Sequence, residues 1–290
     1  MRLVLLTFGD RLENHNQASF AILSFLRSKV ITGVTIVTDR PEYYQYFGHR
    51  IEVINCAGNT MQEWRGEHDF FWRIKMKAIA EAITQNPSDD ILYVDSDTFL
   101  AGDLSVIQSS LDNGNSFMHE REGNLIAIKH KTERKMWSSL SGKTFGPVTI
   151  NERTEMWNAG VIAISKSKAI GIVSLAIQLC DEMCRTDCRR RLIEQFAFGL
   201  ALKHSSNLLP ASTEIGHYHG NKPQWNAKIA EFFMYSLLTR SSFDEDLKRL
   251  EKIDYKSIPT VLREKNTKHR IFNIVNKMMK PKLIRFYGES

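Results

Sequence analysis

Two aspartates stand one residue apart at the end of a short apolar run, and their spacing suits a divalent cation. Residues 91–94 (Ile-Leu-Tyr-Val) predict a strand that is buried on both faces, and Asp95 and Asp97 follow it directly. Open α/β sheets bind ligands at the carboxyl ends of their strands. Two carboxylates this close repel each other unless something positive lies between them, and a diphosphate can complete the coordination of such a cation.

A second Asp-x-Asp sequence shows that the spacing alone is not decisive. Residues 244–246 (Asp-Glu-Asp) have polar or helix-forming neighbours, so these acids fit the solvated first turn of a helix. The buried strand before Asp95 and Asp97 is what favours a binding role for that pair.

Imidazoles and a cation gather in residues 216–223 (Gly-His-Tyr-His-Gly-Asn-Lys-Pro), about 120 residues after the aspartates. A histidine suits Mn²⁺ alongside two carboxylates, and Lys222 could hold a phosphate as a point charge. His217 and His219 are both candidates for the metal ligand. A loop histidine with no ligand role is the alternative for either one.

Three further polar positions fit the same chemistry. Asn158 opens an apolar strand with an amide that could bond sugar hydroxyls, and Glu194-Gln195 at a helix start offers an acceptor and an amide. Arg73, at the beginning of a helix, could reach a diphosphate or a sugar hydroxyl. Each position also has a structural alternative: a polar strand edge, a helix first-turn acid and a solvated helix arginine.

The elements that must position these side chains alternate in the first half of the chain. Strands are expected at 2–8, 34–38, 51–54 and 91–94, and helices at 15–27, 41–47 and 70–85. This rhythm predicts a mainly parallel sheet with helices on both faces. The second half is less regular, with strands expected within 116–130, 156–165 and 208–219 and helices at 167–184 and 190–203. Neither Gly-x-Gly-x-x-Gly nor the Walker sequence occurs, which argues against a dinucleotide dehydrogenase or a P-loop NTPase.

Five ordered segments resemble the retaining glycosyltransferases of family 8, the GT-A-fold group that includes glycogenin and bacterial lipopolysaccharide galactosyl- and glucosyltransferases. The segments are 72–75 (Trp-Arg-Ile-Lys), 93–98 (Tyr-Val-Asp-Ser-Asp-Thr), 157–161 (Trp-Asn-Ala-Gly-Val), 194–195 (Glu-Gln) and 217–223 (His-Tyr-His-Gly-Asn-Lys-Pro). They are similar to the family's Ala-Arg-Leu-Lys, Tyr-Leu-Asp-x-Asp-x, Phe-Asn-Ala-Gly-Val, Asp-Gln and His-Tyr-x-Gly-x-x-Lys-Pro-Trp. The resemblance covers roughly residues 1–226 and implies a GT-A fold, a Rossmann-like mixed sheet flanked by helices.

The resemblance also implies an activity and a site. The activity is metal-dependent transfer of a hexose from a UDP-sugar to a saccharide or lipid-linked acceptor, with retention, in cell-surface polysaccharide or lipopolysaccharide synthesis. Mn²⁺, or Mg²⁺, would be held by Asp95, Asp97 and His217. The donor would be bound by Thr7, Phe8, Arg73, Ser96, Gly220 and Lys222. Catalysis would involve Asn158, Glu194 and Gln195.

The sequence departs from the family pattern at three places, and other classes stay open. The last segment is one residue shorter than the family motif between Gly220 and Lys222, and Glu194 stands where the family has Asp. Residues 7–10 (Thr-Phe-Gly-Asp) differ from the family's usual sequence at the end of the first strand. An inverting GT-A glycosyltransferase is one alternative. A metal-dependent hydrolase using the same aspartates with His217 and His219 is another. A sugar nucleotidyltransferase should carry a Gly-rich loop after the first strand, which is absent here.

Composition describes an ordinary globular chain. Of its 290 residues 42% are hydrophobic and 25% charged, and no apolar run approaches the about 20 residues of a membrane span. The amino terminus is typical of a first strand and not of a signal peptide, so we expect a cytoplasmic protein. Cys180, Cys184 and Cys188 would align on one helix face without the paired spacing of a zinc site, and we expect them to be buried.

The positive charge is concentrated at the carboxyl end. Residues 256–290 carry nine Lys or Arg against two Glu, in a chain of net charge +6. We therefore expect no nucleic-acid partner, and we divide the chain into a catalytic domain at 1–240 and a helical extension at 241–290. Apolar residues recur there at helical spacing: Ile271, Phe272, Ile274, Val275, Met278 and Met279. Cations flank them: Lys268, Arg270, Lys277, Lys280 and Lys282.

That pattern is typical of an interfacial helix on an anionic membrane. It predicts a peripheral protein on the inner face of the plasma membrane. A helix packed on the enzyme's own core or on a second subunit is the alternative.

Overall fold

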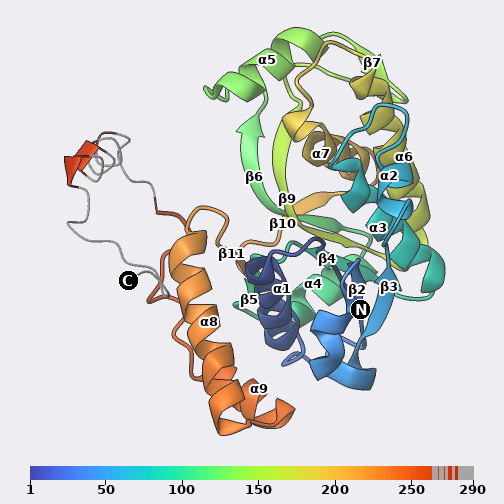
Figure 1. Cartoon of the computed structure of the whole chain (residues 1–290). Helices are drawn as coiled ribbons and strands as arrows, with labels where there is room; N and C mark the ends of the chain where they lie inside the picture. Colours follow the sequence, from blue (N-terminus) through green and yellow to red (C-terminus); the bar gives the residue numbers. More distant parts are fainter. Residues whose placement is uncertain (263–266, 268–270, 272–273, 276–277, 280–290) are drawn as a thin grey trace.

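The computed structural model describes residues 1–262, 267, 271, 274–275 and 278–279 of the chain. Its centre is a seven-stranded sheet of order β10-β6-β9-β4-β1-β2-β3 (Figure 1). The strands are β1 (Arg2–Leu6), β2 (Gly33–Thr38), β3 (Glu52–Asn55), β4 (Ile91–Val94), β6 (Ser116–Asn124), β9 (Glu155–Ile164) and β10 (Leu208–Pro210). Within this sheet β9 runs antiparallel to both its neighbours, and the other pairings are parallel. The predicted mainly parallel mixed sheet is confirmed.

Helices cover both faces of the sheet. One face packs against α3 (Arg73–Gln85), α6 (Lys166–Cys184) and α7 (Ile193–Ser205). The other packs against α1 (Leu12–Phe25) and α4 (Leu104–Asp112), and α8 (Lys222–Thr239) and α9 (Phe243–Glu251) pack on the outside of α1 (Figure 1). Because both faces are covered, the central strands are mostly apolar, and β4 is apolar throughout.

β4 shows how the sequence specifies this arrangement. All four of its residues are buried; Ile91 and Tyr93 point into the core on the α3 side, and Leu92 and Val94 into the core on the α1 side. The strand ends at the next residue, Asp95, whose backbone N–H still donates to the Gly160 carbonyl of β9 at 2.8 Å. The first aspartate is thereby fixed at the carboxyl edge of the sheet.

A small second sheet brings the distant histidine to that edge. β5 (Thr98–Leu100) pairs antiparallel with β11 (Ile215–His217), so that His217 lies opposite Thr98. Beyond β11 the rings of Tyr218 and Trp225 stack at 4.7 Å, and Phe99 stacks on Trp225 at the same distance. This stack fixes the first turn of α8, where Lys222 lies.

Shorter elements complete the described part. They are the 3₁₀ segments η1 (Pro41–Arg50) and η2 (Arg190–Leu192), the helices α2 (Thr60–Trp64) and α5 (Lys131–Leu140), and the hairpin β7 (Thr144–Phe145) with β8 (Val148–Thr149).

The second Asp-x-Asp sequence is structural, as its neighbours indicated. Ser242 caps α9 through a capping box with Glu245. Asp246 is buried and accepts a hydrogen bond from Arg249 at 2.8 Å. These acids stabilise a helix end.

The four cysteines are free and buried. Cys180 and Cys184 lie on α6, whereas Cys188 follows the end of that helix, so the predicted alignment on one helix face stops at α6. The predicted burial of Cys180, Cys184 and Cys188 is confirmed, and Cys56 is buried as well.

The carboxyl end is described in part. Leu250 of α9 is fully buried in the core on the α1 side, and Tyr255 packs against it. The boundary at residue 240 therefore stays a prediction. The described residues contain no helix long and apolar enough to cross a membrane. Several tail positions that carried the membrane prediction lie outside the described residues: Lys268, Arg270, Phe272, Lys277, Lys280 and Lys282.

Candidate active site

Asp95, Asp97 and His217 converge at the carboxyl edge of the sheet. Each offers one ligand atom, and these atoms lie within 4.8 Å of one another. Two carboxylates and one imidazole form a donor set that suits Mn²⁺ and can also take Mg²⁺. His219 is not part of this cluster; its ring centroid lies 4.7 Å from that of His217. The geometry therefore favours His217 as the ligand.

Asp97 is the buried member of the pair, with 4% of its surface exposed. Its Oδ1 lies 3.3 Å from Nε2 of His217, and its Oδ2 lies 2.9 Å from Nζ of Lys222. Burial by itself would raise the pKa of Asp97, but the neighbouring His217 and Lys222 hold it well below its usual range. Asp97 is therefore a carboxylate at neutral pH, as a metal ligand must be.

Asp95 is oriented from the opposite side. The Tyr93 hydroxyl donates to its Oδ1 at 2.9 Å, and Nζ of Lys75 lies 3.1 Å from the same atom. Lys75 is buried, donates to the Ala159 carbonyl at 2.6 Å and lies 3.3 Å from Glu194. Burial lowers the pKa of Lys75, but the two carboxylates outweigh burial and leave it raised. The charged ammonium group of Lys75 thus forms ion pairs with both Asp95 and Glu194.

Lys75 was not among the predicted site residues. It lies on α3 between buried apolar residues such as Ile74 and Met76. A lysine inside an apolar helix face is the signal that could have identified it, because lysine is almost never buried without a partner.

Glu194 and Gln195 stand in the first turn of α7, beside the aspartates. Glu194 is 7% exposed, and burial raises its pKa, while Lys75 acts in the opposite direction. Gln195 donates from Nε2 to Glu122 at 3.1 Å, and Nδ2 of Asn158 lies 3.5 Å from the other oxygen of Glu122. Glu122 therefore orients two amides whose roles were predicted separately.

Gly160 allows the strand and the histidine to approach each other. A Cβ atom at this position would lie 2.3 Å from Cε1 of His217, far inside contact distance. The Asn158 side chain closes the same turn by accepting a hydrogen bond from the Gly160 N–H at 2.9 Å. Gly160 is thus a spatial requirement for placing His217 beside the two aspartates, and Asn158 fixes the turn.

These side chains line one cavity of about 640 Å³. The predicted residues in its wall are Thr7, Phe8, Asp95, Ser96, Asp97, Asn158, Glu194, Gln195, His217 and Lys222. Its wall also holds Asn14 and Arg191, which the sequence did not single out, and Trp72 and Lys75, which stand in the segment 72–75 but were given no role. The cavity has room for a nucleotide-sized ligand.

Two predicted donor-binding residues do not line this cavity. The Arg73 guanidinium donates to both oxygens of Asp181 on α6, at 2.8 and 3.0 Å, and to the Trp64 carbonyl at 2.9 Å. Gly220 instead forms a bridge with Val261, whose Cγ1 would lie 2.9 Å from an added Cβ. Both residues hold chain segments together at the margin of the site.

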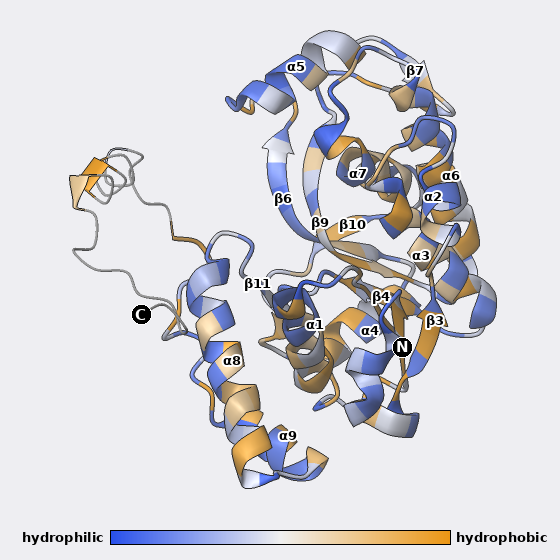
Figure 2. Cartoon of the chain, in the orientation of Figure 1, coloured by the Kyte–Doolittle hydropathy of each residue, from blue (hydrophilic) through white to orange (hydrophobic). Residues whose placement is uncertain are grey.

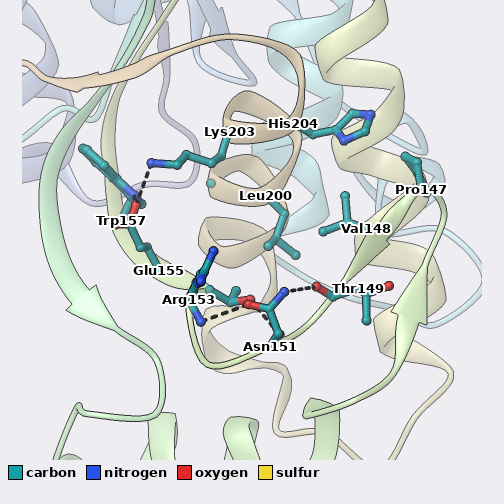
Figure 3. A pocket seen from close by; sticks show the side chains of 12 residues that line it. Pro147, Val148, Thr149, Asn151, Arg153, Glu155, Trp157, Leu200, Lys203 and His204 are labelled. Atoms are coloured by element: carbon teal, nitrogen blue, oxygen red, sulfur yellow. Dashed lines mark hydrogen bonds and ion pairs between the residues drawn. The ribbon is translucent and has the colours of Figure 1, made fainter.

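A second, smaller cavity of about 290 Å³ lies between the β7–β8 hairpin, the start of β9 and the end of α7 (Figure 3). Lys203 points across it to Glu155, with Nζ 3.2 Å from Oε2. None of the predicted site residues lines it. The larger cavity is therefore the candidate active site.

No protein-family profile and no curated protein matches this sequence. Among solved structures, the galactosyltransferase LgtC in complex with donor and acceptor sugar analogues matches 80% of this chain and 94% of its own, with a TM-score of 0.54 and 11% sequence identity. The chain has a GT-A fold. Mouse xyloside xylosyltransferase 1, in its apo form, matches 72% of this chain and 84% of its own at 11% identity; its TM-score of 0.45 adds nothing to the assignment. Identities this low show a shared fold and leave the substrate open.

Proposed function

We propose that this chain is a metal-dependent glycosyltransferase that moves a hexose from a UDP-sugar to a saccharide or lipid-linked acceptor. One observation carries the proposal: Asp95, Asp97 and His217 converge beside Lys222 in a cavity of about 640 Å³. That cavity lies at the carboxyl edge of a GT-A sheet, where α/β folds bind nucleotides. The five ordered sequence segments agree with the same assignment.

The metal-binding side of the cavity suits a diphosphate. A bound divalent cation would neutralise the negative charge that develops on the leaving diphosphate. Asp95, Asp97 and His217 would hold it, and the donor set fits Mn²⁺. Lys222 places a second positive charge 2.9 Å from Asp97, where it can bind the same diphosphate. Thr7, Phe8 and Ser96 would bind the nucleoside end.

The opposite side of the cavity suits a sugar. Asn158, Glu194 and Gln195 present two amides and a carboxylate that can orient hexose hydroxyls. In a retaining transfer the bond from the anomeric carbon to the phosphate oxygen breaks, and a bond to the acceptor oxygen forms on the same face. The departing phosphate oxygen takes the acceptor proton, so the protein needs no general base. Gln195, oriented by Glu122, would steady the oxocarbenium-like centre.

Arg73 has a different role in this proposal. Because its guanidinium is paired with Asp181 and the Trp64 carbonyl, it fastens the segment before α3 to α6. That segment includes Trp72, which lines the cavity. We therefore propose that Arg73 positions the wall of the donor site.

A thermal-shift screen tests the donor class. UDP-, GDP- and dTDP-sugars would each be added with Mn²⁺ or with EDTA. We expect UDP-sugars with Mn²⁺ to stabilise the protein by about 3 kcal/mol at a hundredfold excess over Kd. For a chain of 290 residues that corresponds to a rise in Tm of roughly 5 °C. A flat response to all donors would contradict the proposal.

Product analysis separates the remaining enzyme classes. With a saccharide acceptor, proton NMR should show a product with the anomeric configuration of the donor. Inversion would indicate a single displacement on the same fold. Release of free sugar at the same rate with and without acceptor would indicate a hydrolase.

We also propose a role in cell-surface polysaccharide or lipopolysaccharide synthesis at the inner face of the plasma membrane. The support is the sequence of residues 256–290, with nine cations against two acids beside an apolar stripe. Co-sedimentation with anionic vesicles, comparing the full chain with a chain ending at residue 262, tests this part. Equal binding by the two chains would refute an anchor in the tail.

A further inference from the structure

The outer face of α8 is apolar and exposed. Figure 2 shows hydrophobic positions along this helix, which stands at the outer side of the molecule. Its inner face buries Trp225, Ile229 and Phe232 against the core. Its outer face carries a stripe at helical spacing, made of Ala227, Ala230, Met234, Leu237 and Leu238, with the exposed Lys228–Glu231 ion pair beside it. The last two leucines are 72% and 76% exposed, which is unusual for adjacent residues of this size.

The described part of the tail does not cover this stripe. The tail side chains Ile271, Ile274 and Met278 are themselves 58%, 56% and 81% exposed. Among the described residues, both the α8 stripe and these tail side chains are thus exposed.

We propose that the outer stripe of α8 lies flat on an anionic lipid bilayer. The charge beside it favours this occupant. Val261 pairs with Gly220, and the Leu262 N–H donates to the Gly220 carbonyl at 3.1 Å, two residues before α8 begins. The strongly basic segment therefore leaves the protein beside the first turn of the helix. An apolar stripe with a cationic chain next to it matches a surface of acyl chains and anionic headgroups.

A second copy of the chain fits the stripe less well. Stable protein interfaces bury about 800 Å² on each partner. Three large side chains and two alanines in a single row cannot supply that area.

The orientation has a consequence for the acceptor, which rests on the proposed function. α8 begins at Lys222 in the wall of the active-site cavity and reaches Leu238 after about 24 Å. A helix lying flat holds the Lys222 rim of the cavity beside the membrane surface. That placement suits an acceptor saccharide attached to a lipid.

Vesicle flotation of the full chain tests the surface. The variant Leu237→Gln/Leu238→Gln removes two exposed side chains while keeping good helix formers. Ile170→Gln on α6, where the side chain is 63% exposed, is the matched control. Vesicles would contain phosphatidylglycerol in phosphatidylcholine, with phosphatidylcholine alone as reference. We expect the α8 variant to bind anionic vesicles about tenfold or more weakly, and the control within about twofold of the unmodified chain.

Three outcomes would overturn the proposal. The first is equal vesicle binding by the α8 variant and the control. The second is a fall in molar mass by light scattering on substitution, which would assign the stripe to a second copy. The third is faster lipid-free proteolysis after residue 262 in the α8 variant, which would assign it to the tail. Binding of UDP with Mn²⁺ in solution is measured on the same proteins, so failure of the transferase assignment is seen separately.

Discussion

Replacing Gly160 with alanine would place a methyl group against His217 of the candidate metal site. The new Cβ would lie 2.3 Å from Cε1 and 2.4 Å from Nδ1 of His217, and 3.0 Å from Oδ1 of Asn158. Ordinary carbon contacts begin at about 3.5 Å, so the imidazole must retreat by more than about 1 Å. His217 is 6% exposed and is flanked by the rings of His119 and His219, so it has little room to do so.

The effect on metal binding should be large and the effect on folding moderate. Metal–ligand distances tolerate about 0.2 Å, so a displaced imidazole no longer completes the site. We expect the affinity for UDP in the presence of Mn²⁺ to fall by about 10–100-fold, with the residual affinity insensitive to EDTA. Overpacking costs about 1–3 kcal/mol of folding stability, which leaves the variant folded.

Isothermal titration with UDP and Mn²⁺, together with thermal melting, measures both effects. Gly171→Ala on α6 is the matched control, because nothing lies within 4 Å of an added Cβ there. It should bind as the unmodified chain does and gain about 0.5–1 kcal/mol of stability. If Gly160→Ala retains full Mn²⁺-dependent UDP affinity, His217 is not the ligand and the reasoning fails.

Other predictions address the groups around the cluster. Lys75→Met leaves Asp95 and Glu194 without their cation and should cost about 3–5 kcal/mol of folding stability, measured by denaturant unfolding. The control Lys77→Met on the same helix should cost under about 0.5 kcal/mol. A similarly small loss for both variants would contradict the buried ion pairs of Lys75. Burial and the charge of His217 lower the pKa of His119 to about 4. The neutral His119 imidazole therefore contributes up to about 3 kcal/mol to the free energy of unfolding. This contribution is fully present above pH 6.5 and is lost as the pH falls towards 4. His119→Phe should flatten the stability profile between those values, and an unchanged profile would argue against a neutral buried imidazole. Arg73→Ala and Asp181→Ala should show a coupling energy of about 0.5–3 kcal/mol in a double-mutant cycle, with UDP affinity reduced less by Arg73→Ala than by Lys222→Ala. The reverse order of affinities would assign Arg73 to the donor.

The sequence predicted the elements whose signals are local. The apolar run 91–94 identified β4, and the aspartates after it could be placed at a strand end without any knowledge of their partners. The helix at 166–184 and the strand at 155–164 were likewise found, because their apolar patterns are long. The central strand β9 nevertheless runs antiparallel, and strand direction is decided by packing over the whole chain.

Contacts between residues far apart in the chain could not be predicted from the sequence in the same way. The β5–β11 pairing that delivers His217 joins three-residue strands more than a hundred residues apart, which carry no pattern of their own. Arg73 was assigned to the donor, yet it meets Asp181 because α3 packs on α6. The helix α8 and its exposed face were not predicted, because residues 220–223 (Gly-Asn-Lys-Pro), which include its first two residues, are typical of a loop.

Binding of UDP with and without Mn²⁺ to two aspartate variants tests the central claim most directly. Asp97→Asn changes the buried carboxylate of the cluster, and Asp244→Asn makes the same change in the second Asp-x-Asp sequence, at the start of α9. We predict that Asp97→Asn abolishes Mn²⁺-dependent UDP binding while keeping its secondary structure, and that Asp244→Asn binds as the unmodified chain does. Full Mn²⁺-dependent binding by Asp97→Asn would contradict the account.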